Sequence, residues 1–171
     1  ALLRGPTGSH LESPLEMFSA ARGAGTTLEL DRLALALAIE RFASGHFRGK
    51  LFVNLLPETL VEFGGFPDWL AETLRRHRLS ADRLVIEITE HGEQLDAGPV
   101  RDTAARLRGM GCEIAIDDFG TGLSGLKIWS ELRPDYVKID RYFISRLAED
   151  TIAVEVLRAM LDMAHVLGTR V

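Results

Sequence analysis

Two adjacent aspartates, Asp117 and Asp118, end an apolar stretch and precede a glycine-rich segment, FGTGLSG. Neighbouring carboxylates at the end of a buried strand repel each other, and burial raises the free-energy cost of charging either one. A divalent cation would offset that cost. The pair is therefore the first candidate for metal-dependent chemistry in this chain.

Polar residues recur at equivalent places in four strand-like segments. One side of each segment carries β-branched residues or leucine, and the opposite side carries a polar residue near the carboxyl end, where ligands bind in parallel α/β folds. The four polar residues are Asn54, Glu87, Asp117 and Lys138. Taken singly, a strand-end asparagine is usually a turn residue and a lysine is usually solvated. We interpret the four together as one shared site, because a single metal centre accounts for all of them.

The predicted metal ligands are all hard oxygen donors, namely Asn54, Glu87, Asp117 and Asp118. Such a set favours Mg²⁺, Mn²⁺ or Ca²⁺ over structural zinc. Two ions about 3.5–4 Å apart would hold a phosphodiester and activate water for in-line displacement. Lys138 would orient or deprotonate that water, or stabilise the negative charge that develops on the phosphoryl group.

Composition describes an ordinary globular domain with 171 residues, 46% hydrophobic content and 26% charged residues. The net charge of −5 gives no electrostatic reason to expect binding to long nucleic acid or to an anionic membrane. No apolar stretch reaches the length of a membrane span, and no signal peptide is visible. The single cysteine, Cys112, excludes an intrachain disulfide, fits a reducing compartment and is expected to be a buried strand residue.

The segments that must position these residues alternate between helical and extended patterns. Apolar residues at helical spacing in residues 28–43 (Leu30, Leu33, Ala34, Leu37 and Ala38) predict a helix that ends near Gly45. The later helix-like segments are 68–79, 100–110, 123–132 and 150–167, and the strand-like segments are 51–56, 83–90, 112–118 and 135–140. This alternation predicts βαβ units and a parallel sheet, and residues 168–171 look like the start of a further strand.

The ordered motifs resemble those of the EAL-domain family of cyclic di-GMP phosphodiesterases. The motifs are ALLR at 1–4, VNL at 53–55, EITE at 87–90, DDFGTG at 117–122 and KID at 138–140. The resemblance implies an α/β fold, a TIM-type (β/α)8 barrel with one antiparallel strand near its start. It also implies hydrolysis of cyclic di-GMP to the linear dinucleotide with two Mg²⁺ or Mn²⁺ ions, and inhibition by Ca²⁺.

The resemblance assigns a role to each matching residue. It implies that Asn54, Glu87, Asp117 and Asp118 bind metal and that Lys138 acts in catalysis together with the two aspartates. The implied substrate contacts are Leu2, Arg4 and Asp140, and the implied supporting residues are Glu90, Thr121 and Gly122.

The chain departs from the family pattern at both ends. The signature glutamate that would precede Ala1 and the final strands that would follow Val171 are absent. We therefore expect residues 1–171 to be a single EAL-type domain that is truncated, with a barrel incomplete at its C-terminal end. We expect the complete domain to be an active phosphodiesterase and residues 1–171 alone to be inactive. The alternative is a catalytically inactive cyclic di-GMP receptor.

The resemblance also carries expectations about partners and location. They are cyclic di-GMP as ligand, a homodimer, and a fused GGDEF or sensor domain elsewhere in the protein. The expected location is the cytoplasm, either free or as the cytoplasmic part of a membrane-bound sensor. Within the chain, Gly5 stands where the family often has tryptophan, but no such departure removes a predicted metal ligand.

Overall fold

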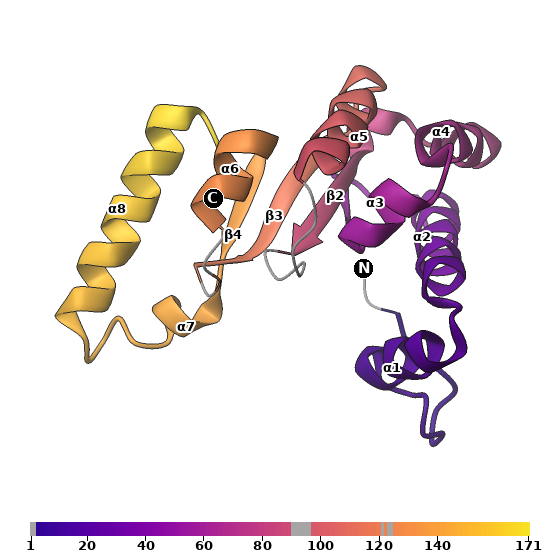
Figure 1. The fold of residues 1–171 in the computed structure, drawn as a ribbon, viewed down its shortest axis with the longest axis horizontal. Coiled ribbons are helices and arrows are strands. Elements are labelled where there is room, and N and C mark those ends of the chain that lie inside the picture. Colours follow the sequence, from indigo (N-terminus) through magenta and orange to yellow (C-terminus); the bar gives the residue numbers. More distant parts are fainter. Residues whose placement is uncertain (1–2, 90–96, 121, 123–124) are drawn as a thin grey trace.

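A computed structural model describes residues 3–89, 97–120, 122 and 125–171 and has an α/β architecture (Figure 1). The helices are α1 (Pro14–Ala24), α2 (Thr27–Ser44), α3 (Pro57–Glu62), α4 (Phe66–Arg76), α5 (Ala97–Gly109), α6 (Gly125–Leu132), α7 (Arg141–Ile144) and α8 (Thr151–Leu167), with a 3-10 turn at Ala81–Arg83. The strands are β1 (Leu51–Asn54), β2 (Leu84–Thr89), β3 (Glu113–Phe119) and β4 (Tyr136–Ile139). The predicted alternation of helices and strands is confirmed.

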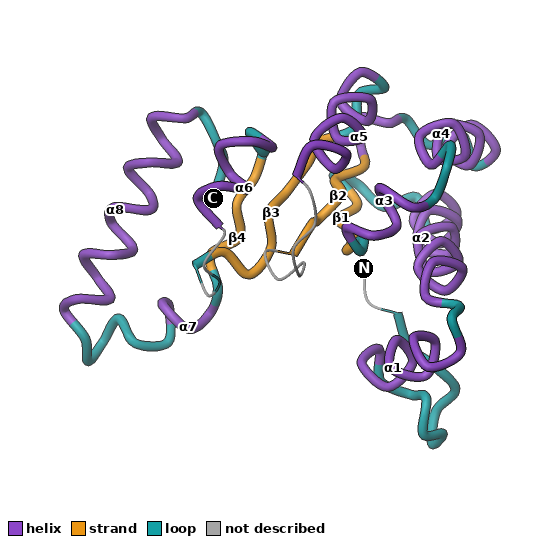
Figure 2. The backbone as a smooth tube through the Cα atoms, in the orientation of Figure 1, coloured by secondary structure: helices purple, strands orange, loops and turns teal. Residues whose placement is uncertain are grey.

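The four strands form one parallel sheet in the order β1-β2-β3-β4, at the centre of the molecule (Figure 2). Asn54 pairs with Glu87, and Thr89 pairs with Asp117, so the strands end close to one another. This arrangement is part of a TIM-type barrel, and the sheet formed by the described residues is open rather than closed. An isolated parallel bridge from Arg170 to Tyr136 lies where the sequence predicted a further strand to begin.

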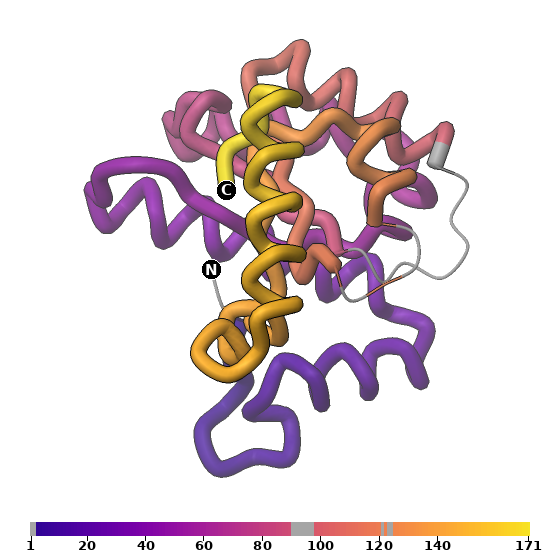
Figure 3. The backbone as a smooth tube through the Cα atoms, turned by 90° about the vertical axis from the view of Figure 1, so that its left-hand side faces the viewer, coloured from indigo at the N-terminus to yellow at the C-terminus, as the bar shows by residue number. Residues whose placement is uncertain are grey.

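The helices pack against one face of the sheet, which carries Val53, Ile86, Ile114 and Val137. The larger apolar core joins β1, β2 and β3 to α2, α4 and α5, and a smaller core around Trp129 joins β3 and β4 to α6 and α8. A view turned by 90° shows α8 lying outermost on its side of the sheet (Figure 3). Cys112 is buried as expected, directly before β3, and burial raises the pKa of its thiol to about 11.

The most deeply buried residues of α2 are not the ones whose spacing predicted the helix. Leu33 is 55% exposed, whereas the buried residues are Asp31, Leu35 and Ile39, which follow one another at four-residue steps. Asp31 begins this row and is its one charged member. An acidic residue thus occupies the core-facing row of an otherwise apolar helix.

None of the described helices combines the length and the apolar composition that crossing a bilayer requires.

Candidate active site

The carboxyl ends of β2, β3 and β4 bring an acidic pair and a lysine into contact. The Nζ atom of Lys138 lies 2.8 Å from Oε1 of Glu87 and 2.9 Å from Oδ1 of Asp117. The side chains of Glu87 and Asp117 are only 5% and 14% exposed, so water screens their charges weakly. The structure therefore places these three predicted residues in one cluster, while their roles in catalysis remain predictions.

The amide of Asn54 completes this cluster from β1. One amide atom lies 3.2 Å from Oδ2 of Asp117 and 3.3 Å from Oε2 of Glu87. With the amide nitrogen at that position, Asn54 donates a hydrogen bond to each acid. With the amide oxygen there, three oxygen atoms face one another, an arrangement that a cation stabilises. The donor set therefore fits a hard divalent cation held by Asn54, Glu87 and Asp117.

Lys138 brings a positive charge to the two carboxylates of the cluster. Burial disfavours its charged form, but the hydrogen bonds and negative charges of Glu87 and Asp117 outweigh burial and raise the pKa of its amine. In this arrangement Lys138 is a charged hydrogen-bond donor.

A bulge in β3 determines where Asp118 lies. Ile116 pairs with Val137 and Phe119 pairs with Ile139, so Asp117 and Asp118 stand opposite the single residue Lys138. Asp118 takes a left-handed backbone conformation with φ of 54°, is exposed, and donates its backbone N–H to Oδ1 of Asp117 at 3.1 Å. Without the bulge, strict alternation would turn Asp118 toward the helix-covered face of the sheet.

The cluster is smaller than the predicted metal site. Across the part of the chain that the structure describes, no three His, Cys, Asp or Glu side chains converge closely enough to hold a metal ion. Glu87 and Asp117 are the two carboxylates that meet, and Asn54 supplies the third oxygen donor. Binding of a second metal ion by Asp118 stays a prediction.

Two open cavities adjoin the cluster. One of about 510 Å³ is lined by Asn54, Glu87 and Lys138 together with Phe52, Tyr136, Val137 and Val171. The other, of about 360 Å³, runs between α1, α2 and β1 and is lined by Arg4, Asp31 and Asn54 among mostly apolar side chains. The predicted substrate contact Arg4 therefore shares a cavity with Asn54.

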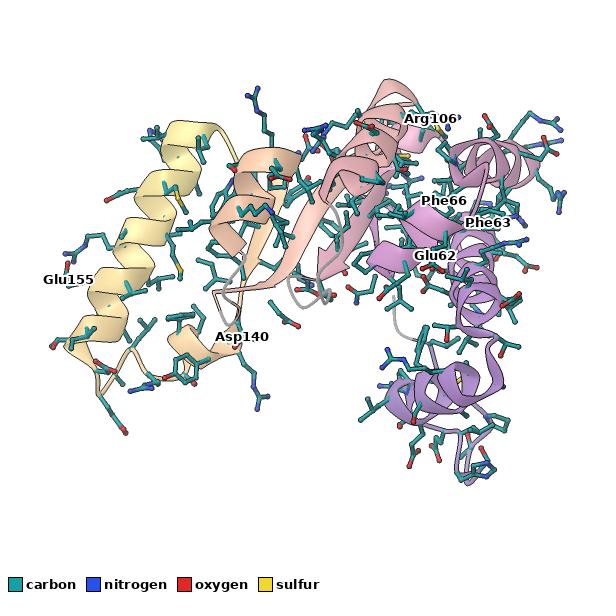
Figure 4. All side chains as sticks on the ribbon, viewed as in Figure 1. Glu62, Phe63, Phe66, Arg106, Asp140 and Glu155 are labelled. Carbon is teal, nitrogen blue, oxygen red and sulfur yellow. The ribbon has the colours of Figure 1, made fainter. Side chains whose placement is uncertain are left out.

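The remaining predicted site residues are placed as follows. Asp140 directly follows β4, where Figure 4 labels it, and its Oδ1 accepts a hydrogen bond of 2.7 Å from the Tyr142 N–H at the start of α7. Gly122 lies in a bend and is half-buried. The predicted residues Leu2, Glu90 and Thr121 lie outside the described residues.

Sequence reasoning missed Asp31, which is 3% exposed and lines the same cavity as Asn54. A detectable signal was present, because Asp31 precedes Leu35 and Ile39 at a helical spacing of four. A charged residue in register with a buried apolar row is unusual unless another element supplies its hydrogen-bond partners.

Comparison with known proteins identifies this arrangement. A family model of the EAL domain matches residues 1–171. The chain belongs to the EAL domain family. Among solved structures, the manganese and cyclic di-GMP complex of Klebsiella pneumoniae BlrP1 superimposes with a TM-score of 0.89 at 30% identity, over 99% of this chain and 42% of that chain. The EAL domain of Pseudomonas aeruginosa FimX bound to cyclic di-GMP gives a TM-score of 0.85 at 27% identity, over 98% of this chain and 68% of that chain.

Sequence relatives of this EAL domain are longer proteins. MucR of Pseudomonas aeruginosa, named a bifunctional diguanylate cyclase and cyclic di-GMP phosphodiesterase, is 30% identical over 178 residues, which cover 100% of this chain and 26% of MucR. An uncharacterized protein of Mycobacterium tuberculosis is 37% identical over 142 residues, which cover 80% of this chain and 23% of that protein. The chain thus spans about a quarter of the length of these relatives.

Proposed function

We propose that this EAL domain is the catalytic part of a metal-dependent phosphodiesterase that hydrolyses cyclic di-GMP to the linear dinucleotide. The observation that carries the proposal is the convergence of Asn54, Glu87, Asp117 and Lys138 from four consecutive parallel strands. A receptor that only bound the nucleotide would have no need to gather two shielded acids around an amine. The relatives named as phosphodiesterases, and the solved complexes with cyclic di-GMP, support the same substrate.

Each residue has a defined part in this proposal. Asn54, Glu87, Asp117 and Asp118 would hold Mg²⁺ or Mn²⁺, and such ions polarise a phosphate oxygen and lower the pKa of bound water. Lys138 donates hydrogen bonds toward the centre of the cluster, so its amine can orient the attacking water and stabilise charge that develops on the phosphoryl oxygens. Arg4 would contact a phosphate of the substrate from the neighbouring cavity.

The proposal extends to the surroundings of the domain. Manganese and calcium complexes of BlrP1 support a divalent metal, and inhibition by Ca²⁺ is part of our proposal. We also propose a homodimer, further signalling domains in the same protein, and a cytoplasmic location. The length of the relatives supports the further domains.

The direct test is hydrolysis of cyclic di-GMP by the full-length protein with Mn²⁺ or Mg²⁺, followed by chromatography of the linear product. Asp117→Ala and Lys138→Ala should each lower turnover by at least about 100-fold, because each removes a group that acts on the reacting phosphate. Asp68→Asn is the matched control, since Asp68 forms an exposed ion pair with Arg106 on the far helices. Near-normal turnover in either cluster variant would contradict the proposed mechanism.

The same experiment separates the two functions. Nucleotide binding without metal-dependent hydrolysis by the wild-type protein would overturn the enzyme and leave a receptor. Absence of both binding and hydrolysis would exclude both.

A further inference from the structure

Asp31 lies on the row of α2 that packs into the core. It is 3% exposed, and the next two members of the row, Leu35 and Ile39, are 2% and 0% exposed. Placing a carboxylate among apolar side chains costs free energy unless other groups donate hydrogen bonds to it. Packing alone would be served as well or better by an apolar residue of similar size. The carboxylate therefore calls for a role beyond filling space.

Both hydrogen bonds to Asp31 come from the segment that follows β1. Its Oδ2 accepts the backbone N–H of Leu56 at 3.0 Å and the hydroxyl of Thr59, which is fully buried, at 2.7 Å. Leu56 is the residue that precedes α3, and its own side chain provides no capping hydrogen bond. Asp31 thus accepts, from α2, the N–H of the N-cap residue, which in a capping box is accepted by the side chain of the third helical residue.

These bonds fix the chain within two residues of Asn54. Leu55 donates its backbone N–H to the carbonyl oxygen of Glu87 at 2.9 Å, and Leu56 donates its N–H to Asp31. The first residue after Asn54 is therefore tied to the neighbouring strand, and the second is tied to α2. α3, which ends at the Glu62 labelled in Figure 4, continues directly from this point.

We infer that Asp31 is a positioning residue that holds the end of β1 so that the amide of Asn54 faces Glu87 and Asp117. The inference rests on the proposed function, because it assigns to Asp31 the support of a predicted metal ligand. Burial raises the pKa of Asp31, while the hydrogen bonds from Thr59 and Leu56 act in the opposite direction and favour its charged form.

The test compares Asp31→Ala, Asp31→Asn and the control Thr73→Val in the full-length protein. Thr73 is a buried threonine of α4 whose hydroxyl donates a hydrogen bond to the carbonyl oxygen of Trp69. Thr73→Val therefore removes a buried polar group from an element that does not contain Asn54. Asparagine keeps the shape of aspartate and retains one oxygen acceptor for the Leu56 N–H. The measurements are the dissociation constant for Mn²⁺, kcat and KM for cyclic di-GMP, and the NMR resonances of the Asn54 side-chain amide.

We expect Asp31→Ala to weaken Mn²⁺ binding and to lower kcat/KM by about 10- to 100-fold, as loss of a group that orients a metal ligand usually does. The Asn54 amide resonances should shift, Asp31→Asn should restore part of the loss, and Thr73→Val should change none of these quantities. A folded Asp31→Ala protein with Mn²⁺ affinity and kcat/KM within twofold of wild type would overturn the inference.

A second variant keeps the test decisive if Asp31→Ala fails to fold. Thr59→Val removes one of the two hydrogen bonds to Asp31 and keeps the one from the Leu56 N–H. We therefore expect a smaller decrease in Mn²⁺ affinity and in kcat/KM. No shift of the Asn54 resonances in either Thr59→Val or Asp31→Asn would count against the inference. Failure of the proposed function would appear as a wild-type protein that does not hydrolyse cyclic di-GMP. Even then, the NMR resonances of the Asn54 amide would show whether Asp31 positions it.

Discussion

Asp118 combines a demanding backbone conformation with a predicted role in metal binding. Its φ of 54° lies in the left-handed region, which costs a residue with a Cβ atom about 1–2 kcal/mol and costs glycine far less. Aspartate and asparagine tolerate this region better than most residues. Asp118 therefore stands at a position where the backbone conformation alone favours glycine.

Asp118→Gly should separate stability from activity. We expect the melting temperature to stay unchanged or to rise, because glycine adopts the left-handed conformation without strain. Metal-dependent hydrolysis should fall by at least about tenfold, because the variant loses a predicted ligand. Thermal denaturation and turnover measured on the same preparation check both parts. A variant with lower stability and full activity would show that Asp118 has a structural role instead.

Residue patterns predicted that the four side chains of the cluster lie together and missed two features around them. Alternation along the strands placed Asn54, Glu87, Asp117 and Lys138 on one face, since side-chain direction in a strand follows from sequence alone. The support of Asn54 by Asp31 was not predicted, because it joins residues 25 positions apart in the chain. The bulge in β3 was not predicted either, because a bulge depends on the register of the neighbouring strand.

Among the structural elements, the beginning of β3 is joined to two distant segments by Glu113. Its carboxylate forms ion pairs with Lys50, directly before β1, and with Arg170, after α8. Burial acts to raise the pKa of Glu113, but the hydrogen bonds and charges of Lys50 and Arg170 outweigh it and hold the pKa below its usual value. Glu113 therefore stabilises the fold in its charged form, at the end of the sheet opposite to the candidate active site.

Glu113→Gln should lower the free energy of unfolding by about 1 kcal/mol at pH 7, since it removes the charge from two partly exposed pairs. A lowered pKa in the folded state stabilises the protein above the unfolded-state value of about 4.3, and this stabilisation is lost as the pH falls through the folded-state pKa. The difference between wild type and variant should therefore shrink as the pH falls. Urea denaturation from pH 7 to pH 3 measures it.

Glu72→Gln provides the control for this comparison, because Glu72 forms an exposed ion pair with Arg75 within α4. We expect it to change the free energy of unfolding by less than about 0.5 kcal/mol at any pH in the series. A Glu113→Gln difference as large at pH 3 as at pH 7 would contradict a role for the charged carboxylate.

From α2 onward, the order of the strands and of the longer helices was predictable, whereas α3 and α7 were not. The long segments that became α2, α5 and α8 each carry enough turns to show a helical period. α3 and α7 have six and four residues, too few to show one, and each begins within three residues of the end of a strand. In α2 the spacing of the apolar residues predicted the helix but did not single out Asp31, which is buried while Leu33 is exposed.

At the scale of the whole molecule, metal binding and folding should be linked. Glu87 and Asp117 lie close together with little exposure, so a cation that binds them in the folded state stabilises that state by mass action. The gain is about 2.7 kcal/mol when the free ion is at 100 times its dissociation constant. Mn²⁺ should therefore raise the melting temperature, and EDTA should reverse the rise.

The stabilisation by Mn²⁺ should depend on the cluster of Glu87 and Asp117 and not on carboxylates at the surface. Asp117→Ala should abolish the Mn²⁺-dependent rise, and Asp68→Asn should retain it, because Asp68 is largely exposed on α4. Differential scanning fluorimetry across a Mn²⁺ titration measures both. An equal rise in all three proteins would place the stabilising ion elsewhere on the molecule.

The bulge in β3 also bears on how such a site can be lost. Two residues of β3 stand opposite one residue of β4 between the pairs Ile116–Val137 and Phe119–Ile139. Deleting Asp118 would restore a regular ladder between these strands, so the shortened chain could have a more regular sheet and yet lack the adjacent carboxylates. In this domain the deletion of one residue could therefore remove the adjacent carboxylates while the protein still folds. Selection for folding alone would not eliminate such a variant.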